Sequence, residues 1–210
     1  SFLSLMENAS REAFHALIGE MGDPAGRRVL LLAGPGNNGG DAVALARHLR
    51  NRGADVTLAL ARPRGQYKGA AGYNVRLAAR LGLPMIPLAK ADLSGTDAPD
   101  VIVDGLLGTG FRGELRPELA AVVEAVNRLA GRSYIFALDI PSGLDGLHGR
   151  PSPMAVRADA TVAFEAAKTG LVAAPAAPFV GKLLVRDIGI PSLVKRSEER
   201  RVGKECRSRW

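Results

Sequence analysis

The chain has 210 residues, with 28 Lys and Arg against 21 Asp and Glu, and a formal net charge of +7. Hydrophobic residues make up 47% of it, a globular composition that excludes a disordered or collagen-like chain. A single Cys excludes a disulfide framework and a cysteine-based zinc site, and no apolar run approaches the roughly 18 residues of a membrane-spanning helix.

Much of the positive charge lies at the C-terminus. Residues 196–210 carry +3 of the +7, together with the only Cys and the only Trp. This segment resembles an in-frame translation of a short-read sequencing adapter, so we expect a non-native tail after a domain of residues 1–195. That domain carries +4 with acidic and basic residues mixed, which disfavours a nucleic-acid partner. The chain does not begin with Met, so we expect the domain to be shortened at both ends.

Helices and strands are predicted to alternate along the chain. Apolar residues at helical spacing predict a helix over residues 3–18, and the apolar run 28–33 predicts a buried strand. Further strands are predicted at 55–60, 85–86, 101–103, 134–138, 160–164 and 182–188, and further helices at 41–52, 67–81 and 118–130. This alternation predicts one α/β domain with a mainly parallel sheet.

A glycine-rich turn, residues 34–41, follows the first predicted strand. Its Gly34-x-Gly36-x-x-Gly39 spacing matches the dinucleotide-binding fingerprint, in which the next helix presents free N–H groups to a phosphate. A simple turn with Asp41 as helix cap is the alternative. The acidic residue expected at the end of the second strand is missing. Arg62 and Arg64 follow that strand instead, which suits a 2′-phosphate.

Two more loops follow strands and begin with a carboxylate, Asp104 in one and Asp139 in the other. Ligands of open α/β sheets bind at the carboxyl ends of the strands, so these loops are expected to converge with the glycine-rich turn. Hard cations prefer oxygen ligands, and Asn38, Asp104 and Ser142 together offer an amide, a carboxylate and a hydroxyl. Each of these residues alone has a cap or turn role as its alternative.

Five segments together resemble the NAD(P)H-hydrate epimerases, over residues 3–191. They are Leu-Met-Glu-Asn-Ala (5–9), Pro-Gly-Asn-Asn-Gly-Gly-Asp (35–41), Val-Asp-Gly-Leu-Leu-Gly-Thr-Gly (103–110), Asp-Ile-Pro-Ser-Gly-Leu-Asp (139–145) and Ala-Asp-Ala-Thr-Val-Ala-Phe-Glu-Ala-Ala-Lys-Thr-Gly (158–170). A late Val-Arg-Asp-Ile-Gly-Ile-Pro (185–191) fits as well. The resemblance implies a Rossmann-like three-layer α/β/α sandwich and a cytoplasmic isomerase.

The resemblance also implies a reaction and partners. The family interconverts the R and S forms of NADHX and NADPHX, which are NADH and NADPH hydrated at C6 of the nicotinamide ring. A partner ADP- or ATP-dependent dehydratase, often fused to the epimerase in bacteria, acts on the S form only. The resemblance further implies a homodimer and neither a nucleic-acid nor a membrane partner.

Site residues follow from the resemblance position by position. Substrate would bind to Asn37, Asn38, Gly39, Gly40, Asp41, Gly108, Thr109, Gly110, Phe111, Arg112, Gly113, Glu114 and Asp139. One K⁺ per subunit would bind to Asn38, Asp104 and Ser142. The sequence departs from the family pattern at Ala42 and Ser10, where glycine is usual. Ala42 is expected to fit a helical turn, and Ser10 puts the packing of the first helix in question.

Epimerisation needs a group that takes and returns a proton, and Asp139 is the predicted acid/base because of its place at a strand end. Lys168 is its predicted electrostatic partner, with a solvated loop lysine as the alternative. An NADP-dependent oxidoreductase is a rival function, although the sequence lacks a Tyr-x-x-x-Lys hydride-transfer site. A non-catalytic binding module is another rival, disfavoured by the intact Asn-Asn-Gly-Gly-Asp run. A Ser142–His148 nucleophile pair is disfavoured because the first Gly of a nucleophile elbow is missing.

Overall fold

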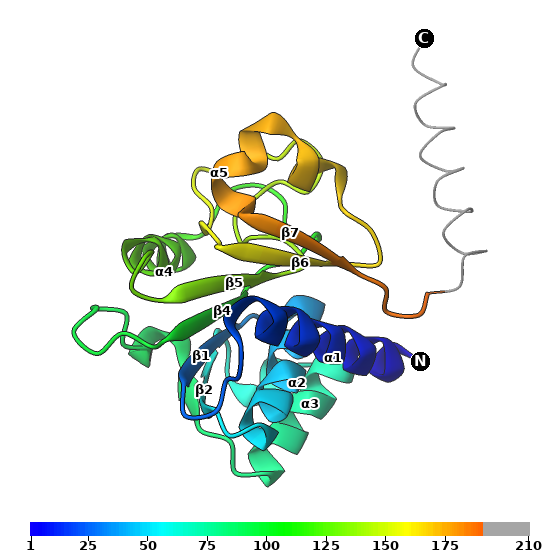
Figure 1. The fold of residues 1–210 in the computed structure, drawn as a ribbon, viewed down its shortest axis with the longest axis vertical. Helices are drawn as coiled ribbons and strands as arrows, with labels where there is room; N and C mark the ends of the chain where they lie inside the picture. The colour runs from blue at the N-terminus through cyan, green and yellow to red at the C-terminus, as the bar shows by residue number, and fades with distance from the viewer. Residues whose placement is uncertain (191–210) are drawn as a thin grey trace.

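A computed structural model describes residues 1–190, and the predicted tail lies outside the described residues. Its centre is a seven-stranded sheet in the order β3-β2-β1-β4-β5-β6-β7, in which every pair of neighbours is parallel (Figure 1). The strands are β1 (Arg28–Ala33), β2 (Asp55–Leu60), β3 (Met85–Pro87), β4 (Val101–Gly105), β5 (Tyr134–Leu138), β6 (Ala160–Phe164) and β7 (Lys182–Arg186).

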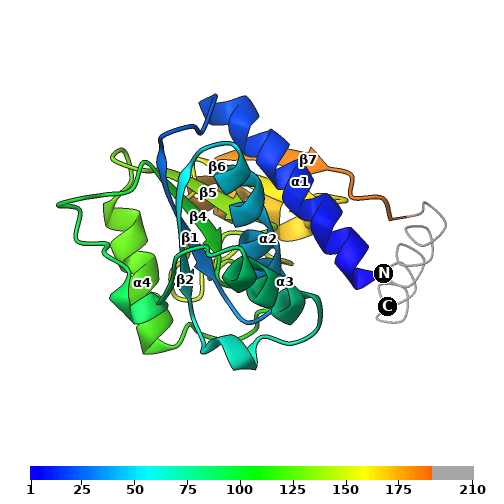
Figure 2. The same ribbon diagram turned by 90° about the horizontal axis from the view of Figure 1, so that it is seen from below.

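Helices cover both faces of the sheet (Figure 2). One face carries α1 (Phe2–Met21), α2 (Asn37–Asn51) and α3 (Gly69–Arg80), whereas α4 (Pro117–Arg128) covers the other. A four-residue helix, α5 (Ala177–Val180), lies near β6 and β7. The predicted three-layer α/β/α sandwich with a Rossmann-like strand order is therefore confirmed.

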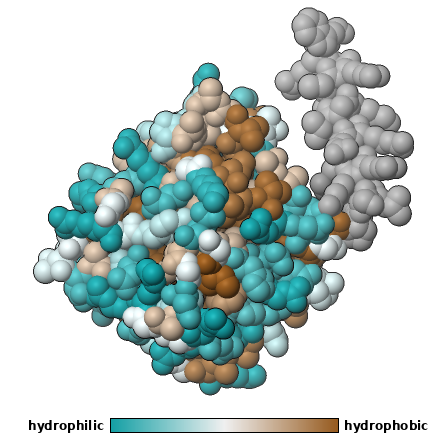
Figure 3. Space-filling model, in the orientation of Figure 1, coloured by the Kyte–Doolittle hydropathy of each residue, from teal (hydrophilic) through white to brown (hydrophobic). Residues whose placement is uncertain are grey.

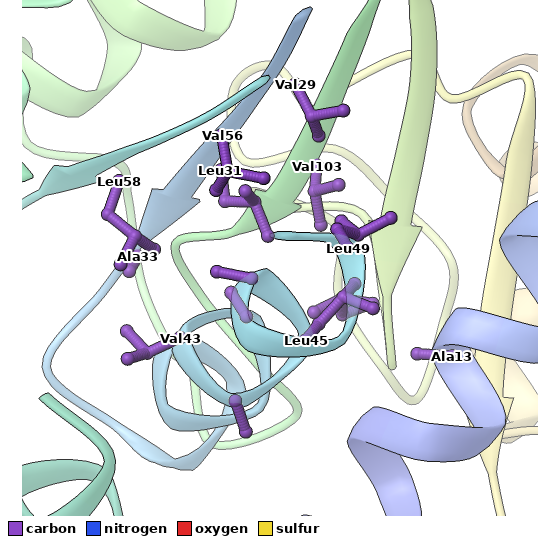
Figure 4. Close-up of a cluster of buried hydrophobic side chains, with 14 of the residues drawn as sticks. Ala13, Val29, Leu31, Ala33, Val43, Leu45, Leu49, Val56, Leu58 and Val103 are labelled. Carbon is purple, nitrogen blue, oxygen red and sulfur yellow. The ribbon is translucent and has the colours of Figure 1, made fainter. Parts of the chain in front are cut away.

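The sheet separates the core into two clusters, and successive residues of each strand contribute to one cluster and then the other. Val29, Leu31 and Ala33 of β1 face α2, and Leu30 and Leu32 face the side of α4. Figure 4 shows the first set with side chains of α2, β2 and β4 around it. Because both faces are buried, the central strands are continuous apolar runs rather than alternating ones, which is what made them visible in the sequence.

Two boundary differences matter for the site. The helix predicted from residue 41 begins at Asn37, so the Asn-Asn-Gly-Gly run forms the first turn of α2 rather than a loop before it. Asp41 is therefore no helix cap, because the cap position belongs to Gly36. The strand predicted at 101–103 continues to Gly105, which places Asp104 inside β4.

Other boundaries shift for local reasons. The helix predicted from Tyr67 begins at Gly69, because Tyr67 is buried and its hydroxyl donates a 2.7 Å hydrogen bond to the carbonyl oxygen of Ala33. The last strand ends at Arg186 instead of residue 188. The short α5 was not predicted, since four residues show no helical period.

Both departures from the family pattern are accommodated. Ala42 is fully buried in α2 and lies against Gly105. A Cβ added at Gly105 would lie 2.7 Å from the Cβ of Ala42. Ser10 is fully buried in α1, and its hydroxyl donates a 2.9 Å hydrogen bond to the carbonyl oxygen of Glu7. The expectation for Ala42 is confirmed, and Ser10 does not break the first helix.

The strand order reverses between β1 and β4. The chain runs from β1 outward to β2 and β3, then returns to β4 on the other side of β1. Ala33 at the end of β1 pairs with Leu60 of β2 and with Gly105 of β4. The segments that follow β1, β4, β5 and β6 therefore meet at one edge of the sheet, where such folds bind ligands.

The surface is mostly hydrophilic in the view of Figure 3, with apolar side chains gathered near β7 and α5. Val172 and Val185 are exposed there. Within residues 1–190, no helix has both the length and the apolar character needed to cross a membrane.

Candidate active site

Two glycines hold the turn between β1 and α2 by close backbone contact. A Cβ added at Gly34 would lie 1.8 Å from the carbonyl oxygen of Leu106, and one added at Gly39 would lie 1.8 Å from that of Gly34. A Cβ at Gly36 would meet no atom within 4 Å. Gly34 and Gly39 are therefore required for packing, whereas Gly36 leaves the backbone open to a ligand.

Asn38 lies in the first turn of α2, where backbone N–H groups have no partner within the helix. Its side-chain nitrogen donates a 2.7 Å hydrogen bond to the carbonyl oxygen of Leu107. Its Oδ1 is buried and accepts no hydrogen bond from any residue that the structure describes. A buried amide oxygen without a donor is costly, so this atom is available to a cation or to a donor on a bound molecule.

Asp104 is wholly buried near the end of β4. Its carboxylate accepts hydrogen bonds from the backbone N–H of Ser142 (2.7 Å), the Ser142 hydroxyl (2.6 Å) and the N–H of Leu106 (3.2 Å). Burial raises the pKa of Asp104, and the bonds from Ser142 and Leu106 oppose the rise. No ion pair formed within residues 1–190 includes it, so its charge has no partner there.

The three predicted cation ligands converge through Leu107. Asn38 donates to the carbonyl oxygen of Leu107, and the Ser142 hydroxyl accepts a 2.9 Å hydrogen bond from the Leu107 N–H while it donates to Asp104. The described residues contain no cluster of three His, Cys, Asp or Glu side chains that could hold a metal ion. The oxygen donors and the uncompensated buried carboxylate nevertheless fit one hard monovalent cation such as K⁺.

Asp139 follows β5 in a turn with a φ of 62°, across which the N–H of Ile140 donates a 2.7 Å hydrogen bond to Leu138. A non-glycine residue in this γ-turn geometry is uncommon and typical of functional positions. The Asp139 carboxylate pairs with Lys168, whose ammonium also donates a 3.1 Å hydrogen bond to the carbonyl oxygen of Phe164. Lys168 is therefore anchored, which disfavours a solvated loop role.

Asp41 joins this pair from α2. Its side chain is buried, and burial raises its pKa well above the ordinary range, with a further rise from the charge of Asp139 and a reduction from Lys168. Burial and the charge of Asp139 therefore act in the same direction on the pKa of Asp41. Two carboxyl groups in different environments beside one ammonium are an arrangement suited to acid/base work.

The loop of residues 108–114 is the least enclosed part of the predicted substrate site. Gly108 lies against Asn38, and Phe111 packs against the core on the α4 side. The Arg112 guanidinium donates 2.7 Å hydrogen bonds to the carbonyl oxygens of Thr109 and Phe111 within its own loop. Gly110, Gly113 and Glu114 are exposed, and their part in substrate binding stays a prediction.

Sequence reasoning missed one contributor. The backbone of Leu107 connects Asn38 with Ser142, and no sequence signal marks a residue that acts through its peptide group. The Ser142–His148 pair does not form, since the Ser142 hydroxyl bonds to Asp104 and His148 pairs with Asp145.

Replacing Asp41 with Asn is expected to flatten the pH dependence of stability. The folded state raises the pKa of Asp41, so it binds more protons than the unfolded state between the ordinary value of about 3.9 and the raised value, and stability falls as pH rises through that window. The amide that replaces the carboxyl group does not titrate, and the variant should gain stability relative to wild type at pH 7.5 but not at pH 4. Urea denaturation at both pH values measures the free energy of unfolding of each protein. The same change in this free energy between pH 4 and pH 7.5 in both proteins would contradict the prediction.

Comparisons with known proteins identify the family of the chain. Residues 3–170 match the family model described as YjeF-related protein N-terminus. The chain is 41% identical to an NAD(P)H-hydrate epimerase of Rhodopirellula baltica, covering 89% of this chain and 75% of the relative. It is 35% identical to the enzyme of that name from Nitrosopumilus maritimus, covering 89% and 85%.

Two further matches extend the comparison. The chain is 40% identical to the bifunctional NAD(P)H-hydrate repair enzyme Nnr of Moorella thermoacetica, covering 89% of this chain but only 36% of that longer protein. The crystal structure of the yeast protein ynu0 (YNL200c) shares the fold with a TM-score of 0.76 at 22% identity, covering 91% of this chain and 81% of the yeast chain. From the family match and from relatives more than a third identical over most of their length, the chain belongs to the YjeF N-terminal family.

Proposed function

We infer that the protein is an NAD(P)H-hydrate epimerase, an isomerase that interconverts the R and S forms of NADHX and NADPHX. The relatives that carry this name match the chain over most of their length. The observation that best supports the same chemistry here is the Asp139–Lys168 ion pair beside buried Asp41, at the strand ends of the switch point.

The site offers the groups that the reaction requires. Inversion at C6 requires that its configuration be lost and remade, by loss and return of water or by opening of the ring. Either route moves a proton to and from the substrate, which we assign to the carboxylate of Asp139. Lys168 fixes the orientation of that carboxylate, and Asp41, whose pKa burial raises, is the second carboxyl group of the cluster.

Binding of the rest of the substrate fits the loops around this cluster. The first turn of α2 presents N–H groups before Gly40 to the pyrophosphate, and Gly36 leaves room for it. In the loop of residues 108–114, Gly108 lies against Asn38 and residues 110 and 112–114 are exposed, so we assign this loop to the open side of the substrate site.

We propose that Asn38, Asp104 and Ser142 hold one K⁺. The cation would supply a positive charge to the buried Asp104 and fix the loops after β1, β4 and β5. Two groups support this proposal. The Asn38 Oδ1 has no hydrogen-bond donor, and the Asp104 carboxylate has no countercharge among the described residues.

Replacing Asn38 with Ala is expected to remove the response to K⁺. In wild type, exchange of NaCl for KCl at constant ionic strength should raise the unfolding temperature, because a cation that binds only the folded state stabilises it. The variant should show no difference between the two salts. Asn51→Ala, at the exposed far end of the same helix, is the matched control and should respond as wild type does. A K⁺ response that survives in the Asn38 variant would contradict the assignment.

The proposal includes a partner and a place of action. An ADP- or ATP-dependent dehydratase would consume the S form, and bifunctional relatives unite repair functions in one longer chain.

A homodimer is the expected assembly, with exposed Phe2, Tyr73 and Val185 as candidates for its contacts. Light scattering after size exclusion tests it. We propose the cytoplasm as its place of action, since its substrate would be a damaged pyridine nucleotide.

A chiral assay tests the proposed function. Purified R-NADHX is incubated with the protein and an S-specific dehydratase, and the return of NADH is followed by absorbance. Recovery faster than spontaneous epimerisation is the expected result, and recovery at the spontaneous rate would overturn it. Consumption of NADPH with a carbonyl substrate would instead favour the oxidoreductase, and binding without turnover would favour a non-catalytic module.

A further inference from the structure

The part of the chain from β2 to β3 is strongly basic. No Asp or Glu occurs between Asp55 and Asp92, a stretch of 36 residues. Six basic residues fall in it: Arg62, Arg64, Lys68, Arg76, Arg80 and Lys90. A run of one sign within a domain of mixed charge indicates an anionic ligand rather than general solubility.

A cavity of about 440 Å³ opens within this stretch, at the carboxyl ends of β2 and β3. Its walls are mainly apolar, and Arg62 and Arg64 are the only charged residues that line it. The full lining is Leu60, Ala61, Arg62, Pro63, Arg64, Met85, Ile86, Pro87, Leu88 and Ala89. A mainly apolar cavity with a few polar groups is typical of sites that bind small molecules and cofactors, and the charged groups here are cationic.

The two arginines are available to an anion. Both are exposed, and neither forms an ion pair with another residue in the described part of the chain. By contrast, Arg47 and Arg28 are paired with Glu7 and Asp97. A guanidinium presents several donors in a fixed plane that matches the oxygens of a phosphate.

The cavity lies where the far end of a bound dinucleotide would fall. The N–H of Ala61 after β2 donates a 2.9 Å hydrogen bond to Ala33, the last residue before the glycine-rich turn. Asp139 follows β5, which is three strand spacings from β2, or roughly 14 Å. A dinucleotide that crosses the switch point with its C6 at Asp139 and its pyrophosphate over α2 would place its adenosine at the end of β2.

The residue at the end of β2 bears on which dinucleotide fits. Sites that bind NAD commonly place an Asp or Glu there, which accepts a hydrogen bond from the ribose 2′-hydroxyl. Here β2 ends in Leu60, and Ala61 and Arg62 follow. No carboxylate is present to accept that bond or to repel a phosphate.

We propose that this cavity binds the adenosine of the substrate, that Arg62 and Arg64 bind its 2′-phosphate, and that the enzyme therefore prefers NADPHX to NADHX. This specificity rests on the proposed epimerase function. The substrate site would then consist of the catalytic cluster after β5 and an adenosine subsite on the β2 side of the sheet.

The test compares the two substrates in wild type and in the double variant Arg62→Gln/Arg64→Gln. We expect wild type to favour NADPHX in kcat/KM by roughly 10- to 100-fold, because charge-assisted hydrogen bonds to two guanidinium groups are lost with NADHX. The double variant should turn over both substrates about equally, with the loss confined to NADPHX. Arg76→Gln/Arg80→Gln, the same charge change on exposed residues of α3 outside the cavity, should keep the preference.

Calorimetry with adenosine 2′,5′-bisphosphate and with 5′-AMP separates this proposal from the proposed function. The bisphosphate should bind more tightly than 5′-AMP in wild type and the α3 control, but not in the Arg62/Arg64 variant. Absence of epimerisation with this binding pattern would overturn the function and support the subsite. Equal turnover of both substrates by wild type, or a preference that survives in the Arg62/Arg64 variant, would overturn the subsite.

Discussion

Epimerisation is expected to slow by about 10²- to 10⁴-fold when Asp139 is replaced with Asn, because the amide cannot take and return a proton. Asn is the informative substitution at this position. Asp139 has a φ of 62°, which Asn adopts readily, whereas Ala would add backbone strain. Substrate binding should persist, so the loss should appear in kcat. Steady-state kinetics in the dehydratase-coupled assay, with isothermal calorimetry for binding, measures both quantities.

Asp55→Asn is the matched control for this variant. Asp55 is an exposed carboxylate at the amino end of β2, on the opposite edge of the sheet, and its replacement should leave kcat unchanged. Lys168→Gln should lower kcat less than Asp139→Asn, because the lysine orients the carboxylate but does not carry the proton. Turnover at the wild-type rate in Asp139→Asn would remove Asp139 as the acid/base.

Replacing Gly39 with Ala should destabilise the protein by about 3 kcal/mol or more, since the new Cβ would lie 1.8 Å from the carbonyl oxygen of Gly34. Neither group is the flexible end of a side chain, so α2 or the end of β1 must move. In a domain of this size the loss corresponds to a fall of roughly 6–12 °C in the unfolding temperature. Thermal denaturation followed by circular dichroism measures it.

Gly36→Ala separates packing from ligand access within the same turn. A Cβ at Gly36 meets nothing within 4 Å, and the φ of −86° suits alanine, so stability should stay within about 1 kcal/mol of wild type. Its KM for substrate should rise, because the methyl group would stand where the pyrophosphate approaches the backbone. Equal stability of the Gly36 and Gly39 variants would show that the close backbone contact at Gly39 does not limit the stability of the fold.

The strands and the strand-end location of the site were predictable because burial on both faces leaves a direct trace in the sequence. The limits of β1, β2, β5 and β6 match the apolar runs to the residue. Asp139 was predicted from its place after such a run, and the structure places it there, paired with Lys168.

Contacts made by the backbone were not predictable. The first turn of α2 contains two Asn and two Gly, which favour loops by intrinsic preference, and tertiary packing overrides that preference. The bonds that join Asn38, Ser142 and Asp104 pass through the peptide groups of Leu107, whose side chain has no part in them. The burial of Asp41 beside Asp139 depends on how α2 packs on the sheet, and no local pattern encodes that placement.

The reversal of strand order between β1 and β4 has a consequence for synthesis on the ribosome. The strands β1, β2 and β3 with their helices are complete once residue 87 has emerged, yet the free edge of β1 stays unpaired until β4 arrives. The catalytic pair requires Lys168, which emerges about sixty residues after the end of β4. A nascent chain therefore exposes the apolar edge of β1 until β4 docks, and it cannot form the catalytic pair until the segment after β6 is in place.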